Sequence, residues 1–381
     1  MRLNSYDDFT PLHEVIVGSA ANYMGHDRDL SFELFYHESI TGFRSDWAYP
    51  RLTSSNGMNA ETWKINQRYA DELHEDVEQL AQTLAALGVT VHRPLPLPED
   101  ATPIAGLGWQ AAPTPALNVR DNTLVIGDQI IETPPAIRSR YLETQLLHGV
   151  FQNYARSGAQ WSVMPRPTLS DASFDLSYAR DSTTTLGGPT ESIADPRSGP
   201  YDVGHEMMLD GAQVLRLGRD LIVNVAQDNH EQGLRWLRTH LGKRFRLHRV
   251  WRMADNHIDS MLLALRPGVF LTRHHGIRDL MPESFRSWRF IVPPEPDHGA
   301  FPVYDDYDDL VLTSPYIDLN IFSINEHTVL ANEDCTGLIK ALETEGFDVI
   351  PVRHRHRRLF GGGFHCFTLD THRDGGPEDY T

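Results

Sequence analysis

Residues 214–224 read Val-Leu-Arg-Leu-Gly-Arg-Asp-Leu-Ile-Val-Asn, so two apolar runs flank a short turn at Gly218 and Arg219. Glycine adopts the positive φ that a tight hairpin turn needs, and this stretch therefore predicts a β-hairpin. The same arrangement recurs at residues 123–133, 262–272 and 319–332. A hairpin pattern that returns along the chain indicates a repeat architecture.

Each hairpin opens a larger unit of hairpin, helix and strand. Helical patterns follow three of the hairpins, and a short strand-like run follows each helix: helices at 136–155, 230–241 and 334–345, strands at 161–163, 245–251 and 347–352. A further copy is split, with a strand at 14–18, an amphipathic helix at 61–87 and a strand at 89–91. In the unit that begins at Leu262, an irregular insertion follows Thr272 and precedes a strand at 290–292.

Five such units place the chain in the α/β class and favour a closed radial arrangement, because radial repetition protects the edges of short strands. The alternative is an open mixed sheet without symmetry. The connectors at 93–115 and 182–200 are rich in Pro and Gly, and we interpret them as surface loops rather than linkers. We therefore expect one domain over residues 1–381.

Composition excludes several classes of partner. Against 34 Lys and Arg stand 52 Asp and Glu, and the formal charge of −18 repels nucleic-acid phosphates and anionic membranes. No stretch reaches the roughly 18 apolar residues of a membrane span, and the N-terminus lacks the apolar region of a signal peptide. The chain has two cysteines, which is typical of a reducing compartment. We expect a soluble, cytoplasmic protein with small-molecule substrates. The sequence leaves open whether the protein forms a homo-oligomer.

The strongest local motif lies near the C-terminus, where residues 359–366 read Leu-Phe-Gly-Gly-Gly-Phe-His-Cys. Three glycines remove Cβ crowding and let backbone approach a ligand closely, which makes Cys366 a candidate nucleophile. An inert, buried thiol is the alternative. Cys335 opens a predicted helix without a glycine frame, and we interpret it as structural.

A nucleophilic cysteine needs an acid or base and an orienting carboxylate. Among 19 histidines, His257 stands out because Asp259 would project from the same face of an extended segment. Asp121 precedes one hairpin and Asp220 lies at the turn of another, although a turn Asp commonly caps its own backbone. Several carboxylates around a thiol suit a planar cation such as a guanidinium, which pairs bidentately with carboxylates.

These residues resemble a known family. The segment 359–366, His257-Ile-Asp259, the stretch 209–220 and Arg120-Asp121 are similar to the amidinotransferases, which include glycine amidinotransferase and inosamine-phosphate amidinotransferases. The likeness also takes in, in collinear order, residues 12–18, 130–134, 138–140 and 164–167.

The resemblance implies a five-bladed, pseudo-symmetric α/β propeller of the pentein type. It makes Cys366 the nucleophile, His257 the general acid and base, Asp220 the partner of that histidine, and Asp121 with Asp259 the ligands of the guanidinium. It implies transfer of the amidino group of L-arginine to a primary amine through an amidino-cysteine, with release of ornithine, and it implies no cofactor and no metal. The closest alternative is an arginine or guanidine hydrolase of the same fold, and a binding protein without catalysis is a further one.

The sequence departs from the family where the ends of the substrates would bind. Either Arg273 or Arg278 is expected to hold the donor carboxylate, and Asn320 matches a family position at the substrate. Asp318 replaces a small residue, so it either recognises an amino group of the acceptor or caps a turn. The unmatched region 22–50 is a further place for acceptor choice. The basic run at 353–358 is interpreted as a solvated loop, with a nucleic-acid patch as the alternative that the net charge opposes. The run could also raise the positive potential near Cys366.

Overall fold

The computed structural model describes residues 1–381 apart from 26–28, 33–65, 175–203, 255, 303–312 and 314. Most of the unmatched region 22–50, the start of the predicted helix at 61–87 and the connector at 182–200 lie outside the described residues. Among the described residues, no helix is both long and apolar enough to cross a membrane.

The described strands form five three-stranded sheets of one topology and a small two-stranded sheet, β3 (Ile104–Ala105) with β4 (Gln110–Ala111). In each larger sheet the middle strand is antiparallel to one neighbour, which is its hairpin partner in four of the five sheets, and parallel to the strand beyond the helix. Four of these sheets follow the predicted hairpins: β5 (Thr123–Ile126), β6 (Gln129–Glu132) and β7 (Gln160–Val163); β8 (Val214–Leu217), β9 (Asp220–Val225) and β10 (Arg246–Trp251); β11 (Leu262–Arg266), β12 (Val269–Thr272) and β13 (Arg289–Ile291); β14 (Phe322–Ser323), β15 (Thr328–Asn332) and β16 (Asp348–Val352).

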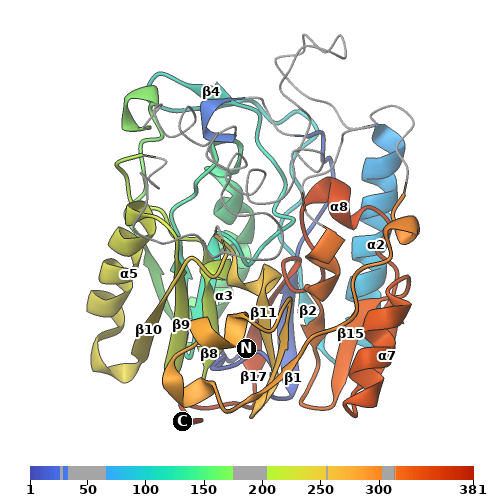
Figure 1. The fold of residues 1–381 in the computed structure, drawn as a ribbon. Coiled ribbons are helices and arrows are strands. Elements are labelled where there is room, and N and C mark those ends of the chain that lie inside the picture. The colour runs from blue at the N-terminus through green and yellow to red at the C-terminus, as the bar shows by residue number, and fades with distance from the viewer. Residues whose placement is uncertain (26–28, 33–65, 175–203, 255, 303–312, 314) are drawn as a thin grey trace, which may run out of the picture.

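The fifth sheet joins the two ends of the chain. Strand β1 (Leu12–Val17) lies between β2 (Thr90–His92), with which it is parallel, and β17 (Thr368–Arg373), with which it is antiparallel. Figure 1 shows the blue N-terminal strand beside the red C-terminal one. The split first copy is thus completed by the C-terminus, and this pairing places Cys366 directly ahead of a sheet strand.

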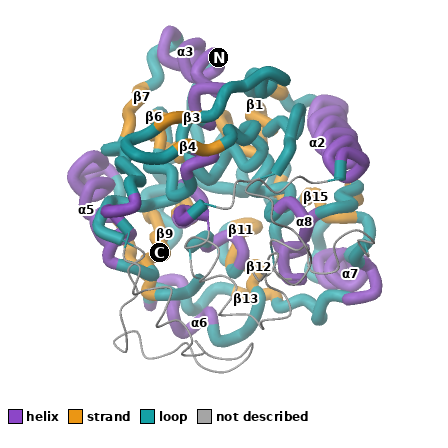
Figure 2. Tube along the Cα trace, turned by 90° about the horizontal axis from the view of Figure 1, so that it is seen from above, coloured by secondary structure: helices purple, strands orange, loops and turns teal. Residues whose placement is uncertain are grey.

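Four helices cover the outside of these sheets and lie at the periphery in Figure 2: α2 (Gln67–Ala86), α3 (His148–Arg156), α5 (Asp228–Leu241) and α7 (Thr336–Thr344). Helix α2 buries Leu73, Val77, Leu80 and Leu84, a spacing of three and four residues that forms one apolar face. In α5, Leu234, Leu237 and Leu241 do the same against β8 and β9.

One predicted helical region differs in the structure, and the segment predicted as an irregular insertion has little regular structure. The region 136–155 begins as two 3-10 turns, Arg138–Arg140 and Glu143–Leu147, before α3. Arg140 binds Glu143 through two hydrogen bonds, of 2.5 and 2.8 Å, and this buried pairing holds the turns in place of a continuous helix. The insertion after Thr272 contains only the short α6 (Ile277–Leu280) and a 3-10 turn.

Candidate active site

Cys366 is held by the glycine loop between α8 (Arg357–Phe360) and β17. A Cβ on Gly362 would lie 2.4 Å from Asn118 Oδ1, and one on Gly363 would lie 2.6 Å from the Asn320 Cβ. Glycine is therefore required because both asparagines approach the loop backbone closely. The amide of Cys366 donates to Asn320 Oδ1 over 2.9 Å, so Asn320 holds the backbone of the predicted nucleophile.

The thiol of Cys366 is buried in a negatively charged environment. Its residue is 4% exposed, and Sγ donates to Asp259 Oδ2 over 3.5 Å. Burial raises the pKa of this thiol well above its usual range, and the charges of Asp259 and Asp121 raise it further. Without a ligand, the sulfur therefore carries its proton at neutral pH.

His257 lies immediately before the 3-10 turn Ile258–Ser260, between two carboxylates. Its Nε2 donates to Asp210 Oδ2 over 2.7 Å, and its Nδ1 lies 3.9 Å from Asp121 Oδ1. Burial lowers the pKa of His257, but Asp121 and Asp210 outweigh burial and raise it to about 9. The ring is therefore a cation at neutral pH and can give up a proton.

The predicted pairing of His257 with Asp220 is wrong, since the partner in the structure is Asp210. Asp220 opens β9 directly opposite Arg246 of β10, and its carboxylate binds Arg246 at 2.8 and 2.5 Å and His248 at 2.6 Å. Asp210 instead caps the 3-10 turn that leads into β8, in a capping box with Gln213. The motif Asp-x-x-Gln ahead of a predicted strand is the signal that could have found it.

Asp121 and Asp259, the residues expected to hold a guanidinium, are both buried beside this pair. Asp121 Oδ2 binds Arg140 at 2.7 Å, and Asp259 Oδ2 accepts from His365 Nδ1 at 2.7 Å. The other oxygen of each carboxylate, Oδ1, is buried without a hydrogen-bond partner among the described residues. Two unsatisfied carboxylate oxygens in one site call for a cationic hydrogen-bond donor, because unpaired buried acceptors are costly.

The two candidate arginines lie at different distances from this site. The amide of Arg273 donates to Met261 O over 3.0 Å, only two residues beyond Asp259, and its buried guanidinium lies over the Tyr316 ring at 3.9 Å. Arg278 is exposed on α6, over Phe290 at 4.9 Å. The structure thus brings Arg273, rather than Arg278, next to the site segment.

Asp318 is not a free carboxylate at the site, because it forms an ion pair with the buried guanidinium of Arg357. Nearby Cys335 precedes α7, and burial together with the charge of Asp318 raises the pKa of its thiol far above the usual range. A thiol so firmly protonated agrees with the structural interpretation of Cys335.

The basic run at 353–358 is not the solvated loop that its composition predicts. Its side chains dock on acids of other elements: Arg353 and Arg355 bind Asp76 of α2 at 2.9 and 2.8 Å, and His356 binds Glu72 of α2 at 2.6 Å. The run therefore attaches α2 to the segment that leads to the glycine loop.

Known proteins resemble the chain over its whole length, although no family model matches it. Inosamine-phosphate amidinotransferase 1 of Streptomyces glaucescens is 32% identical over 98% of each chain. This chain belongs to the amidinotransferases. As such it is an enzyme that transfers amidino groups. The L-arginine:L-lysine amidinotransferase of Pseudomonas savastanoi pv. phaseolicola is 33% identical to this amidinotransferase over 82% of each chain.

Solved structures of known proteins share the fold of this chain. The inosamine-phosphate amidinotransferase of Streptomyces griseus superimposes with a TM-score of 0.80, at 29% identity and with 99% of each chain covered. The dimethylarginine dimethylaminohydrolase of Pseudomonas aeruginosa covers 94% of this amidinotransferase and 99% of its own chain, with a TM-score of 0.51 at 12% identity. The latter likeness concerns the fold alone.

Proposed function

We propose that this amidinotransferase moves the amidino group of L-arginine to a primary amine through a covalent amidino-Cys366 intermediate and releases ornithine. The observation that carries the proposal is the site around the thiol. Cys366 Sγ lies 3.5 Å from Asp259, two buried carboxylate oxygens accept no hydrogen bond from the described residues, and His257 is held as a cation next to Asp121. The name of the arginine:lysine relative supports arginine as the donor.

Donor binding activates the sulfur. The guanidinium of arginine carries a positive charge and planar N–H donors, which match the free oxygens of Asp121 and Asp259. Its charge offsets the carboxylates that hold the thiol protonated, so the pKa of Cys366 falls when the donor is bound. Arg273 holds the carboxylate of the donor, since it adjoins the segment that carries Asp259.

The first half-reaction forms the covalent intermediate. As the donor binds, the thiol gives up its proton to solvent, and the thiolate of Cys366 adds to the guanidinium carbon to give a neutral tetrahedral adduct. The imidazolium of His257 then protonates the Nε nitrogen of the donor as the carbon–nitrogen bond breaks. Ornithine departs, Cys366 carries a cationic amidino group, and His257 is neutral. Asp210 orients the ring through its 2.7 Å hydrogen bond.

The second half-reaction reverses these roles. Neutral His257 takes a proton from the acceptor amine as the nitrogen attacks the amidino carbon, and the carbon–sulfur bond breaks to return the thiolate. The product is a new guanidinium compound. Because donor and acceptor use one site in turn, the kinetics are ping-pong.

Hydrolysis of the same intermediate is the second candidate. The likeness to a dimethylaminohydrolase supports it only through the fold, at 12% identity, whereas amidinotransferases match at 32 and 33%. We therefore propose transfer. Transfer requires that water is excluded from the amidino-enzyme.

The architecture that we propose for this site is a closed ring of the five sheets, within one domain over 1–381. Contacts between neighbouring units support it: residues of β17 meet β5, residues of β11 meet β8, and bridges join Ser5 to Gly127 and Asp7 to Leu217. Both thiols are unpaired, which supports a reducing, cytoplasmic setting.

The test is incubation with L-arginine and a panel of amines that includes glycine, lysine, ornithine and an amino-cyclitol. Product analysis by mass spectrometry should show ornithine with a new guanidino compound. Citrulline or urea in place of that compound would indicate the hydrolase.

A further inference from the structure

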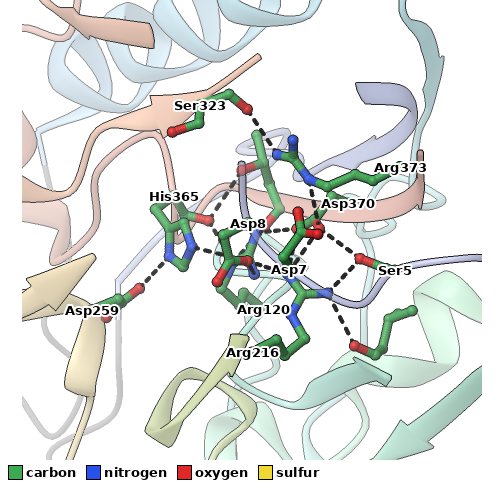
Figure 3. A network of polar contacts seen from close by, with 12 residues as sticks. Ser5, Asp7, Asp8, Arg120, Arg216, Asp259, Ser323, His365, Asp370 and Arg373 are labelled. Carbon is green, nitrogen blue, oxygen red and sulfur yellow. Dashed lines mark hydrogen bonds and ion pairs between the residues drawn. The ribbon is translucent and has the colours of Figure 1, made fainter. Parts of the chain in front are cut away.

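His365 is the residue before the proposed nucleophile, and its ring lies on the side of Asp259 that faces the interior. Its Nδ1 donates to Asp259 Oδ2 over 2.7 Å (Figure 3). The same oxygen accepts from the Cys366 thiol at 3.5 Å. Nδ1 carries the hydrogen in this contact because an ionised carboxylate can only accept. The His365 ring thus holds Oδ2 of Asp259 and leaves Oδ1 for a ligand.

The backbone of His365 is itself held firmly. Its amide donates to Asn320 O over 3.2 Å, and its carbonyl accepts from Arg120 Nε over 3.0 Å. The Nε2 atom of the ring lies 3.8 Å from Asp8 Oδ1 and makes no hydrogen bond among the described residues. The ring is therefore placed by its backbone and by its short contact with Asp259, and its Nε2 side makes a longer ion-pair contact with Asp8.

Behind His365 lies a buried network of three guanidinium groups and two carboxylates (Figure 3). Asp370 accepts from Arg120 at 2.7 Å, from Arg216 at 2.8 Å and from Arg373 at 3.0 Å. Asp8 pairs with Arg216 and, at 3.4 Å, with Arg120. Asp7, also buried, adds a third carboxylate near Arg373. The ring of His365 stands between these arginines and Asp259 (Figure 3).

The buried arginines offer the Asp259 carboxylate a second orientation, in which the site would not function. Arg120 contacts the carbonyl of His365 and acts on Asp259 as a positive charge that helps to lower the pKa of that carboxyl, although burial opposes it. If the ring did not occupy its place, the carboxylate could turn toward the cationic network. Oδ2 would then leave the thiol, and Oδ1 would no longer be placed for a ligand.

We propose that His365 is a positioning residue that, through its Nδ1 hydrogen bond, keeps Asp259 turned toward Cys366 and screens it from the buried arginine network. The proposal rests on the proposed function, because it assumes that Asp259 attracts a cationic substrate group. It does not require that group transfer occurs, and this difference allows a separate test.

Three variants distinguish the two ring nitrogens. The amide nitrogen of Asn can occupy the place of Nδ1, that of Gln reaches the place of Nε2, and Leu supplies neither donor. For each variant, the rate of Cys366 alkylation by cationic chloroacetamidine is divided by the rate with uncharged iodoacetamide. Peptide mass spectrometry separates Cys366 from Cys335, and thermal unfolding reports folding. The ratio cancels a general change in the reactivity or accessibility of the thiol.

We expect the ratio in His365→Asn to stay within about twofold of wild type and that in His365→Gln and His365→Leu to fall about tenfold, as for a lost hydrogen bond to a charged group. Equal ratios in all three variants, at any level, would overturn the proposal. If His365→Leu does not fold, the Asn and Gln variants still decide. A wild-type enzyme without preference for the cationic reagent would instead contradict the guanidinium site of the proposed function.

Discussion

Asp210 and Asp220 flank the same strand, yet they lie at its opposite ends and serve different purposes. Asp210 lies four residues ahead of β8 and reaches His257, whereas Asp220 follows the hairpin turn and binds Arg246 and His248. Three other site residues share the position of Asp210, just ahead of a strand. Asp121 lies two residues before β5, Asp259 three residues before β11 and Cys366 two residues before β17. The entry ends of the sheets therefore carry the chemistry, and the turn end that holds Asp220 carries a structural ion pair.

The largest expected effect separates the two cysteines. Cys366→Ala removes the nucleophile at an entry end and should abolish transfer while the fold remains, because alanine fits beside the glycines. Cys335→Ala, the matched control ahead of α7, should retain activity within a few-fold. Steady-state transfer assays and thermal unfolding of both variants measure this. Residual transfer by Cys366→Ala near the wild-type rate would refute covalent catalysis.

The second prediction compares the two acids directly. Asp210→Asn should lower kcat by about 10²–10⁴-fold, since loss of the carboxylate removes the orientation and charge stabilisation of His257. Asp220→Asn should leave kcat within a few-fold and lower the free energy of unfolding by about 1 kcal/mol, because it weakens a half-exposed ion pair that solvent partly screens. Kinetics and denaturant unfolding of both variants report these values. If Asp220→Asn lowered kcat more than Asp210→Asn does, the assignment of the chemistry to the entry ends of the sheets would be wrong.

The third prediction concerns the carboxylates with unpaired oxygens. Asp121→Asn and Asp259→Asn should each reduce kcat/KM for arginine by about 2–4 kcal/mol of transition-state stabilisation, with smaller effects on folding. The kcat/KM for arginine, measured at saturating acceptor, gives the loss. Near-normal values in both variants would mean that the guanidinium binds elsewhere.

The smallest effect is a dependence on pH. At neutral pH the free enzyme has a protonated Cys366 thiol and a protonated His257, and the transition state of the arginine step has lost one of these protons. The kcat/KM for arginine should therefore rise up to tenfold per pH unit and level off near pH 9, where His257 loses its proton. A profile that is flat between pH 7 and 9 would show that the free site already holds a thiolate.

The sequence predicts much of this fold because hairpins are local. A glycine turn between apolar runs specifies β8 with β9 without reference to the rest of the chain. Strand β17 was missed for the opposite reason. Its partner β1 lies at the other end of the chain, and its buried Asp370 and Arg373 read as surface residues because their countercharges come from distant elements.

The sequence also predicts much of the candidate site, but not all of its pairings. The glycine loop, His257 and Asp259 stand in recognisable motifs, and the structure brings them together with Asp121. The partner of His257 was misassigned because the choice between Asp210 and Asp220 depends on which end of the hairpin faces the site. The pairing of Asp318 with Arg357 depends on the packing of α8, which no local pattern reveals.

The central claim is that Cys366 carries the amidino group between two substrates. The most direct test quenches the enzyme with acid after it has met L-arginine alone, followed by mass spectrometry of its peptides. The account predicts one amidino group on the peptide that contains Cys366, one equivalent of ornithine, and loss of the modification when an acceptor amine is added. An unmodified Cys366 with ornithine released only when acceptor is present, or an amidino group on Cys335, would contradict it.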